Sequence, residues 1–253
     1  MIPLKEPWEL VVMRTAGKKL AEIVAGLREQ VFVDMTTLEI DRITEEAILA
    51  AGAKPAFKGY KVGKAVFPAT ICVSINEQVV HGIPSKRRIK AGDLVSLDFG
   101  LIYGGYYADT AFSVILGEGD EASKRLLEAT EAAMLLGIEK AKVGARVGDI
   151  GHAIETYVRP RGLGVVTQMV GHGIGRKLHE PPSVPNYGKR GTGDLLKPGM
   201  VIAIEPMITL GGDRTKILND QWTVVTEDNS RSAHFEHTVA ITPAGPEILT
   251  RLD

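Results

Sequence analysis

The chain has 253 residues, with 30 lysines and arginines against 31 aspartates and glutamates, which gives a formal net charge of -1. This balance excludes a strong overall attraction to nucleic acid or to an anionic membrane surface. A chain of this length buries about 70 to 75% of its unfolded surface, enough to build a rigid active site. The single cysteine, Cys72, excludes an intramolecular disulfide and favours a reducing compartment.

The N-terminal residues carry no signal for export or membrane insertion. They lack a basic start followed by an uninterrupted apolar stretch, and no run of about 18 apolar residues occurs in the chain. We therefore expect a soluble, unprocessed, cytoplasmic protein without a membrane partner.

The first half of the chain is predicted to contain two helices followed by strands. Apolar residues at helical spacing predict amphipathic helices over residues 8–31 and 37–51, the second capped by Thr36 or Thr37. Glycines at residues 101–105 predict a hairpin turn between the last two strands. The predicted strands cover residues 70–75, 94–100 and 106–116.

The second half repeats this order. Helices are predicted over residues 121–141 and 147–161, and the Gly/Pro-rich segment 179–198 is expected to be a long irregular loop of functional importance. Strands are predicted near residues 165–170, 201–208, 221–226 and 233–242. Two helices and then strands, twice, predict a single α+β domain over 1–253 with pseudo-repeat halves of about 1–117 and 118–253 around a central sheet.

Four acidic residues lie within apolar runs that are typical of half-buried strands. Asp98 is in LVSLDFG, Asp109 in YYADTAF, Glu205 in VIAIEPM and Glu236 in HFEHTVAI. An ionised carboxylate in such a strand costs far more free energy than a surface one unless a positive charge meets it. None of the four runs contains a lysine or an arginine. Bound metal is therefore the leading explanation.

The spacing of Asp98 and Asp109 strengthens this interpretation. Because they lie on strands joined by a tight turn, we expect them to face each other across the ladder, where like charges destabilise the pair. The alternative for either acid alone is a solvated strand end or a turn cap, and for Glu205 or Glu236 alone a raised pKa or a backbone partner. Four acids with one or two imidazoles would supply enough donors for two divalent ions.

The histidines divide into candidates for a cleft and ordinary hydrogen-bonding residues. His152 lies in a predicted helix and belongs to the second group. His237 follows Glu236 directly and should face away from it, whereas His234 shares the Glu236 face and stays ambiguous. Three histidines lie in glycine- and proline-rich segments where a side chain could point into a cleft, namely His81, His172 and His179.

Four long motifs give the chain a resemblance to a known family. The segments HGIPSKRRIKAGDLVSLDFGLIYGGYYADTAFS, VGHGIGRKLHEPPSVPNY, LKPGMVIAIEPMI and WTVVTEDNSRSAHFEHTVAIT resemble, in order and spacing, the type I methionine aminopeptidases. The resemblance covers essentially the whole chain. It implies the pita-bread fold, an α+β fold with pseudo-twofold halves, a central antiparallel sheet and helices that cover it.

The resemblance also implies a dinuclear metal centre that removes the initiator methionine from nascent proteins with a small second residue. A hydroxide shared by two divalent ions, of cobalt, iron, manganese or zinc, would attack the first peptide carbonyl. One ion would also bind the free α-amino group. The metal ligands implied by matching positions are Asp98, Asp109, His172, Glu205 and Glu236, with Asp109 and Glu236 bridging.

The same matching implies residues that handle the substrate. His179 would stabilise the scissile carbonyl or its oxyanion, His81 would contact the peptide near the scissile amide, and Glu205 would also shuttle a proton. The methionine side chain would occupy a slot that suits a thioether. Ordinary core packing is the alternative for each residue of this slot, which comprises Tyr60, Cys72, Leu178 and Trp222.

The sequence departs from the commoner family pattern near this slot. The segment KVGKAVF, residues 61–67, is longer than expected, and Phe57, Phe67 and Leu178 replace an expected Cys, Tyr and Phe. The resemblance further implies a monovalent cation, Na or K, bound by backbone carbonyls near Asn76, Gln78 and Ser232.

Partners and alternatives follow from the resemblance. The implied substrates are nascent-chain N-termini, with a transient ribosome contact, no nucleic acid sequence recognition and a monomeric state. One alternative is an Xaa-Pro aminopeptidase or prolidase, although the segment before His81 leaves little room for their large N-terminal domain. Type II enzymes carry a helical insertion for which we find no space between Val165 and Glu236. Another alternative is a non-catalytic peptide-binding module, but such relatives lose metal ligands and this chain keeps all five.

Overall fold

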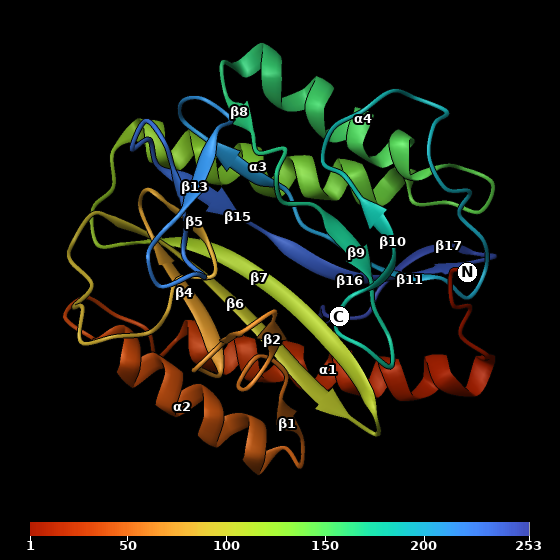
Figure 1. Cartoon of the computed structure of the whole chain (residues 1–253), viewed down its shortest axis with the longest axis horizontal. Coiled ribbons are helices and arrows are strands. Elements are labelled where there is room, and N and C mark those ends of the chain that lie inside the picture. Colours follow the sequence, from red (N-terminus) through yellow and green to blue (C-terminus); the bar gives the residue numbers. More distant parts are fainter. Residues whose placement is uncertain (253) are drawn as a thin grey trace.

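Four long helices flank a curved antiparallel sheet in the computed structural model, which describes residues 1–252 (Figure 1). In the view of Figure 1, α1 and α2 lie below the strands, and α3 and α4 lie above them. No helix within residues 1–252 is long and apolar enough to cross a membrane. The helices are α1 (Pro7–Arg28), α2 (Thr37–Ala50), α3 (Glu121–Lys140) and α4 (Val147–Val158).

Side-chain caps define where two of these helices begin. The Thr36 hydroxyl accepts a hydrogen bond from the Glu39 amide at 3.2 Å, and the Glu39 carboxylate accepts one from the Thr36 amide at 2.7 Å. This reciprocal capping box satisfies two amide donors that the first turn of α2 leaves free. Asp120 caps α3 by accepting from the Ser123 amide at 2.7 Å. The structure confirms Thr36 as the cap predicted for the second helix.

The strands of the first half are dominated by one long hairpin. Strands β6 (Asp93–Tyr103) and β7 (Tyr106–Leu116) pair along their whole length. Gly104 and Gly105 form the two-residue turn with φ values of 58° and 82°, a conformation that glycine adopts at little cost. The other strands are β1 (Lys54–Pro55), β2 (Lys61–Val62), β3 (Ala65–Val66), β4 (Ile71–Ile75) and β5 (Gln78–Val80).

The strands of the second half are shorter. Every pairing among the described strands is antiparallel. The strands are β8 (Gly164–Val165), β9 (Gly171–Gly173), β10 (Glu180–Val184), β11 (Val201–Ile204), β12 (Met207–Thr209), β13 (Thr215–Ile217), β14 (Val224–Thr226), β15 (Ser232–His234), β16 (Glu236–Thr242) and β17 (Gly245–Ile248).

The two halves meet in the middle of the main sheet. Its strand order is β1-β6-β7-β16-β11-β9-β10, with β4 on β6 and β17 on β16. The central β7–β16 ladder pairs Glu236 with Ala111 and His237 with Thr110. Strands of the first half therefore lie on one side of this ladder and strands of the second half on the other.

The core fixes the face on which β6 presents its polar residues. Helix α1 packs on β6 and β7, with Leu20 and Leu27 buried. Leu97 and Phe99 belong to the same apolar cluster, and each such side chain contributes about 1.5 to 3 kcal/mol by burial. Successive side chains on a strand alternate between its faces, so Asp98 lies on the face opposite Leu97 and Phe99.

Several predicted strand and helix boundaries are wrong, and proline explains two of them. The predicted 201–208 strand breaks at Pro206, which has no amide to donate to the ladder. The predicted helix over 147–161 ends at Val158 and continues as a short 3₁₀ turn containing Pro160. The expected irregular loop at 179–198 begins with strand β10. Three further corrections concern strands. The strand predicted near 165–170 is absent beyond Val165, because β8 ends there and β9 begins only at Gly171. The predicted strand 233–242 divides at Phe235, and β14 begins at Val224.

Candidate active site

A cavity of about 110 Å³ opens where the central strands of both halves meet. One end of it is acidic and the other is apolar. The cavity collects nearly all the residues predicted from sequence for metal, catalysis and substrate. It is lined by Phe57, Tyr60, Val62, Phe67, Cys72, His81, Asp98, Asp109, His172, Leu178, His179, Glu205, Trp222 and Glu236.

The β6–β7 hairpin places Asp98 and Asp109 on one face. The two-residue turn pairs Tyr103 with Tyr106, and this register puts Asp98 opposite Ala111 and Asp109 opposite Gly100. The prediction that the two acids directly oppose each other is therefore wrong. They are diagonal neighbours on the same face, close enough for their charges to interact.

Strand β16 brings Glu236 to the same place, because Glu236 pairs with Ala111. Ligand atoms of Asp109, His172 and Glu236 all lie within 4.8 Å of one another. Glu205 follows the last residue of β11, and its Oε1 lies 3.5 Å from Nε2 of His172. The acids and one imidazole thus converge from both halves of the sheet, as expected if they bind the same metal ions.

The tautomer of His172 is set by its neighbour. Its Nδ1 lies 2.9 Å from the Gly173 carbonyl, which can only accept, so Nδ1 carries the proton. In the neutral ring Nε2 then presents a lone pair toward the Glu205 carboxylate. Two electron-pair donors at this distance do not hydrogen-bond to each other, whereas a metal ion between them would bind both.

Buried polar atoms without partners concentrate in this cluster. Asp109 is 5% exposed and Glu236 is 2% exposed. Within residues 1–252, four of the seven buried side-chain atoms without a hydrogen-bond partner belong to the cluster: Asp98 Oδ1, Asp109 Oδ1, Glu236 Oε1 and His234 Nε2. Native proteins rarely leave buried polar atoms unpaired, and unpaired buried carboxylates are especially costly. This donor set therefore fits a divalent metal centre.

The pKa values of the acids reflect the same burial without partners. Burial raises the pKa of Asp98 to about 6, and the nearby Glu205 charge adds to the rise. Burial, reinforced by neighbouring carboxylates, raises the pKa values of Asp109 and Glu236 well above their usual range. Glu205 differs: burial raises its pKa, but the approach of His234 and His172 outweighs this and lowers it. A bound cation would reverse the upward shifts.

Two further histidines lie beside the acid cluster. The Tyr60 hydroxyl is 2.6 Å from Nδ1 of His179, and the His179 ring lies edge-on to His172 with centroids 4.3 Å apart. Loss of solvent lowers the pKa values of His179 and His81 to about 4, so both are neutral at pH 7. His81 adopts a φ of 59°, an unusual conformation for a residue other than glycine that often marks a functional position.

The apolar end is built from loops, from the β2–β3 hairpin and from Cys72 on β4. Phe67 and Trp222 pack edge to face at 5.2 Å. Cys72 on β4 pairs with Asp98, and burial raises the pKa of its thiol well above the usual value. Val62, from the β2–β3 hairpin, was not anticipated as a lining residue. Its sequence offered one signal, an apolar residue within the unexpected segment 61–67.

The residues predicted for a monovalent cation lie outside this cavity. The Asn76 carbonyl accepts a hydrogen bond from the Ser232 amide at 2.9 Å, so these two positions are adjacent. Gln78 lies on β5 and pairs with Val225. None of the three residues lines the cavity.

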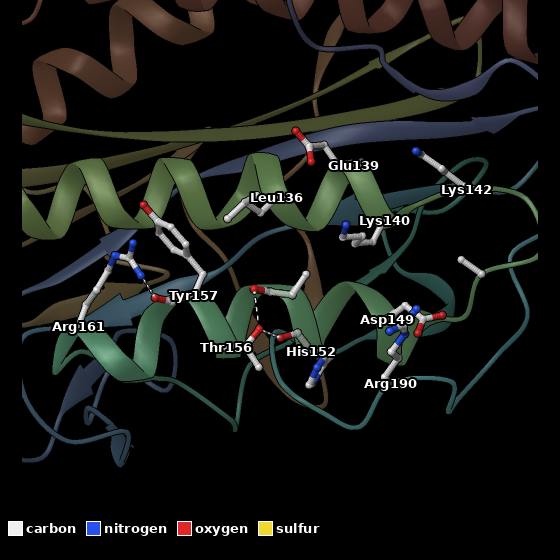
Figure 2. A pocket seen from close by; sticks show the side chains of 12 residues that line it. Leu136, Glu139, Lys140, Lys142, Asp149, His152, Thr156, Tyr157, Arg161 and Arg190 are labelled. Carbon is white, nitrogen blue, oxygen red and sulfur yellow. Dashed lines mark hydrogen bonds between the residues drawn. The ribbon is translucent and has the colours of Figure 1, made fainter.

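The remaining histidines separate clearly. Nε2 of His234 lies 3.6 Å from Glu205 Oε2, so the residue left ambiguous by the sequence belongs to the cluster. His237 faces away, with Nδ1 2.9 Å from the Thr250 hydroxyl, as predicted. His152 on α4 lines a larger surface cavity of about 700 Å³ between α3 and α4 (Figure 2). That cavity contains no cluster of buried acids.

The chain is similar to known proteins over nearly its whole length. The chain matches the sequence model of Metallopeptidase family M24 over residues 11–243. It is 49% identical to a methionine aminopeptidase of Clostridium perfringens over 99% of each chain, and 46% identical to methionine aminopeptidase 1 of Bacillus subtilis over 100% of each. The crystal structure of methionine aminopeptidase from Rickettsia prowazekii superposes with a TM-score of 0.96 at 41% identity, covering 99% of this chain and 100% of that one.

The chain therefore belongs to metallopeptidase family M24. Within that family it belongs to the methionine aminopeptidases, as its motifs predicted, and its fold is the pita-bread fold. A prolidase from Pyrococcus furiosus shares the fold with a TM-score of 0.78, at 24% identity over 99% of this chain and 66% of the prolidase. That likeness concerns the fold alone.

Proposed function

We propose that this enzyme removes methionine from the N-termini of peptides and nascent proteins whose second residue is small, with two divalent metal ions bound by the acid cluster. The observation that carries the proposal is the junction of the two ends of the cavity. Unpartnered buried carboxylates lie at one end and an apolar slot at the other. If the scissile bond of a peptide lay at this junction, the side chain of the peptide's first residue would enter the slot. The carbonyl group of that residue would lie beside the acids.

The proposed ligands are the residues that converge from both halves of the sheet. Asp98 and Asp109 come from the hairpin, Glu236 from β16, Glu205 from the end of β11 and His172 from β9. Bound divalent metal would lower the pKa of a coordinated water and polarise the scissile carbonyl. Carboxylate and imidazole ligands can bind manganese, iron, cobalt or zinc. The monovalent cation near Asn76, Gln78 and Ser232 is a separate part of the proposal.

His179 is proposed to donate a hydrogen bond to the carbonyl oxygen. A tyrosine hydroxyl donates readily to an unprotonated imidazole nitrogen, and Tyr60 Oη lies 2.6 Å from His179 Nδ1. With Nδ1 accepting, the single proton of the neutral ring lies on Nε2. That proton is available to the negative charge that develops on the oxygen in the transition state. His81 is proposed to contact the peptide near the scissile amide.

Glu205 is proposed to accept and return the proton of the reaction. The pKa of Glu205 is lowered, which keeps it ionised at neutral pH, whereas burial raises the pKa values of the other three acids of the metal-free cluster. An ionised carboxylate beside the reacting atoms can act as general base, and afterwards it can protonate the leaving amine.

The apolar slot is proposed to select methionine. Phe67, Cys72, Leu178 and Trp222 surround it, and a flexible thioether packs well against aromatic and sulfur-containing walls. Tyr60 also lines the cavity, and its hydroxyl contacts Nδ1 of His179 at 2.6 Å. Binding of the first side chain and alignment of the carbonyl are therefore coupled through neighbouring residues.

The cellular setting completes the proposal. We propose that the whole chain acts as one catalytic domain, as a monomer in the cytoplasm, and meets its substrates during a transient ribosome contact. The test of the reaction uses purified enzyme, added metal and two peptides, one beginning Met-Ala and one beginning Ala-Pro. We expect methionine release from the first that a chelator stops. Cleavage of the Ala-Pro peptide without cleavage of the Met-Ala peptide would contradict the proposal.

A further inference from the structure

The loop that carries His179 is tied down from outside the cavity. It connects His172 on β9 with Glu180, the first residue of β10, and Glu180 pairs with Gly173. Two hydrogen bonds fix its first part: the Ile174 amide donates to Val201 at 3.0 Å, and the Tyr107 amide donates to the Gly175 carbonyl at 2.8 Å. These contacts hold the start of the loop, the pairing of Glu180 with Gly173 holds the backbone at its end, and the Glu180 side chain provides a further anchor.

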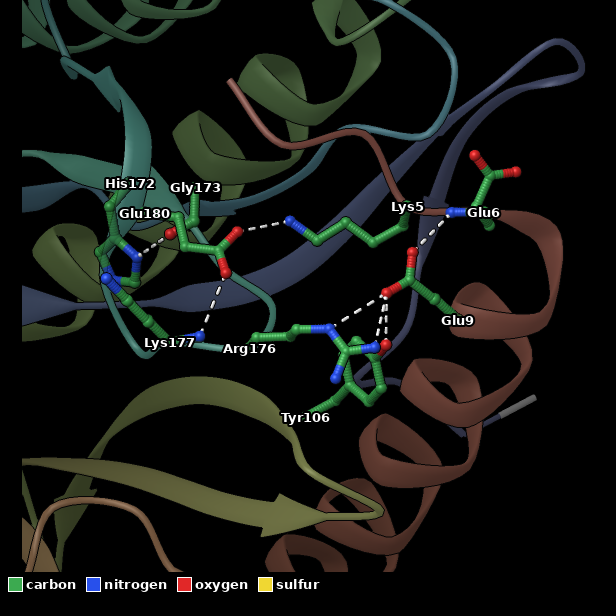
Figure 3. A network of polar contacts seen from close by, with 9 residues as sticks. All are labelled: Lys5, Glu6, Glu9, Tyr106, His172, Gly173, Arg176, Lys177 and Glu180. Atoms are coloured by element: carbon green, nitrogen blue, oxygen red, sulfur yellow. Dashed lines mark hydrogen bonds and ion pairs between the residues drawn. The ribbon is translucent and has the colours of Figure 1, made fainter. Parts of the chain in front are cut away.

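That anchor is a buried ion pair with the N-terminal segment (Figure 3). Lys5 Nζ lies 2.6 Å from Glu180 Oε2, and the two side chains are 5% and 7% exposed. Glu180 Oε1 also accepts from the Lys177 amide at 3.1 Å, so one carboxylate closes the loop and binds the lysine. A buried pair of this kind is costly to assemble and rarely improves stability over apolar packing. Because Glu180 lies next to His179 in the chain, the pair can act on the position of His179.

Two glycines make room for the lysine. The Lys5 amide donates to the Gly199 carbonyl at 2.7 Å, which fixes the segment against the residues that precede β11. A Cβ at Gly175 would lie 2.7 Å from Lys5 Nζ, so a larger residue there would displace the ammonium group. The absence of a side chain at Gly175, the last residue of the GHGIG motif, thus leaves the space that the end of Lys5 occupies beside Glu180.

A second, more exposed group of polar contacts lies near the buried pair (Figure 3). Arg176 Nη2 is 3.0 Å from Glu9 Oε1, and the Tyr106 hydroxyl donates to the same carboxylate. The Arg176 guanidinium lies over the Tyr106 ring at 4.6 Å. The Arg176 side chain is 59% exposed, so this group of contacts should contribute less than the buried pair. Arg176 therefore provides a matched control in the same loop.

We propose that Lys5, through Glu180, is a positioning residue for His179, and this rests on the proposed function. The ion pair fixes the end of the loop so that the His179 ring meets Tyr60 and faces the scissile carbonyl. His172 is also held by the pairing of Gly173 with Ile202 on β11, a contact that does not involve the ion pair. Loss of the ion pair should therefore impair the carbonyl contact while metal binding is kept.

The test uses the double variant Lys5→Met/Glu180→Gln, which leaves no buried charge unpaired and retains an acceptor for the Lys177 amide. We expect kcat on a Met-Ala peptide to fall by roughly 10- to 100-fold, the size associated with a displacement of about 1 Å, with KM and metal affinity little changed. Imidazole ¹⁵N resonances of His179 in the metal-free protein should shift as the Tyr60 contact loosens. Arg176→Gln should have a smaller effect on both.

A double-mutant cycle separates positioning from simple stabilisation. In a His179→Ala background, Lys5→Met/Glu180→Gln should lower kcat by less than about twofold, because the residue on which it acts is gone. An equal fall in both backgrounds, unchanged kcat with a lowered melting temperature, or a rise in KM alone would each overturn the proposal. A wild-type enzyme that released no methionine would instead contradict the proposed function.

Discussion

The two ends of the cavity are built in different ways. The acid end is set by strand ladders, in which the pairings of Asp98 with Ala111 and of Glu236 with Ala111 fix the relative positions of the carboxylates. The apolar end is set by loops and by the β2–β3 hairpin, which bring Val62, Phe67 and Trp222 together. The register of a strand ladder fixes which side chains are neighbours on each face, whereas loops tolerate insertion and substitution.

This difference indicates a division of labour. The acid end must hold several like charges against their repulsion, which requires a rigid frame and a cation. The apolar end only has to fit a side chain, so it can vary in sequence without loss of the chemistry. The enzyme should therefore be sensitive to single changes at the acid end and graded in its response at the apolar end.

The largest effect is expected for Asp109→Asn. This change removes a proposed shared ligand, so methionine release should fall to the level of the uncatalysed reaction. In the metal-free protein the same change should raise the melting temperature, because it removes a buried carboxylate whose pKa is raised by burial and neighbouring charge. Thermal unfolding with and without metal measures both effects, and His152→Ala on α4 serves as the control. Wild-type activity in Asp109→Asn would show that the acid cluster is not catalytic.

A large effect, but one well short of complete loss of activity, is expected for His179→Ala. Loss of one donor to a developing oxyanion costs about 100- to 1,000-fold in kcat. Metal should still bind, since His179 is not a proposed ligand, and saturating metal at about 100 times its Kd should still stabilise the fold by about 2.7 kcal/mol. Calorimetric metal titration beside steady-state kinetics distinguishes the roles. Loss of metal from this variant would mean that His179 is a ligand.

The Tyr60 hydroxyl offers a more subtle test. Tyr60→Phe keeps the ring against His179 but removes the hydrogen bond to Nδ1. We expect kcat to fall by about 2- to 10-fold, the size of one neutral hydrogen bond, with KM nearly unchanged. A large rise in KM with constant kcat would instead assign Tyr60 to binding of the methionine side chain alone.

Effects at the apolar end should be graded with the burial of the side chain that is changed. Leu178 is 4% exposed. Leu178→Ala should lower kcat/KM for peptides that begin with methionine by about 10-fold. It should also reduce the preference of the enzyme for methionine over shorter first side chains. Val62 is 58% exposed, so Val62→Ala, its matched control, should change kcat/KM by less than about twofold. Competing peptides that begin with methionine or norvaline measure the preference. A larger effect at Val62 than at Leu178 would contradict this ranking.

Much of the fold could be predicted from the sequence because local signals were strong. The helix starts at Thr36 and Asp120 have side-chain caps, and the Gly104–Gly105 turn defines the hairpin. Strand breaks were harder, because apolar periodicity continues through Pro206 and Phe235 although the ladder does not. Strand β10 was missed because its Gly- and Pro-rich surroundings are typical of loops.

The site divides in the same way. The five proposed ligands could be selected because their motifs occur in a recognisable order, and the structure brings them together; their roles stay predictions. The diagonal placement of Asp98 and Asp109 depends on the register of one turn, which the strand pattern alone does not specify. The Lys5–Glu180 pair joins residues 175 positions apart, and no local pattern links two such distant side chains.

The central claim is that the buried acids bind divalent metal and that this metal is required for methionine release. The most direct measurement titrates the metal-free enzyme with manganese or cobalt and follows heat and Met-Ala cleavage in parallel. We predict two equivalents bound, with cleavage absent before metal is added and rising with occupancy. Methionine release by the metal-free enzyme, or active enzyme that binds no metal, would contradict the account.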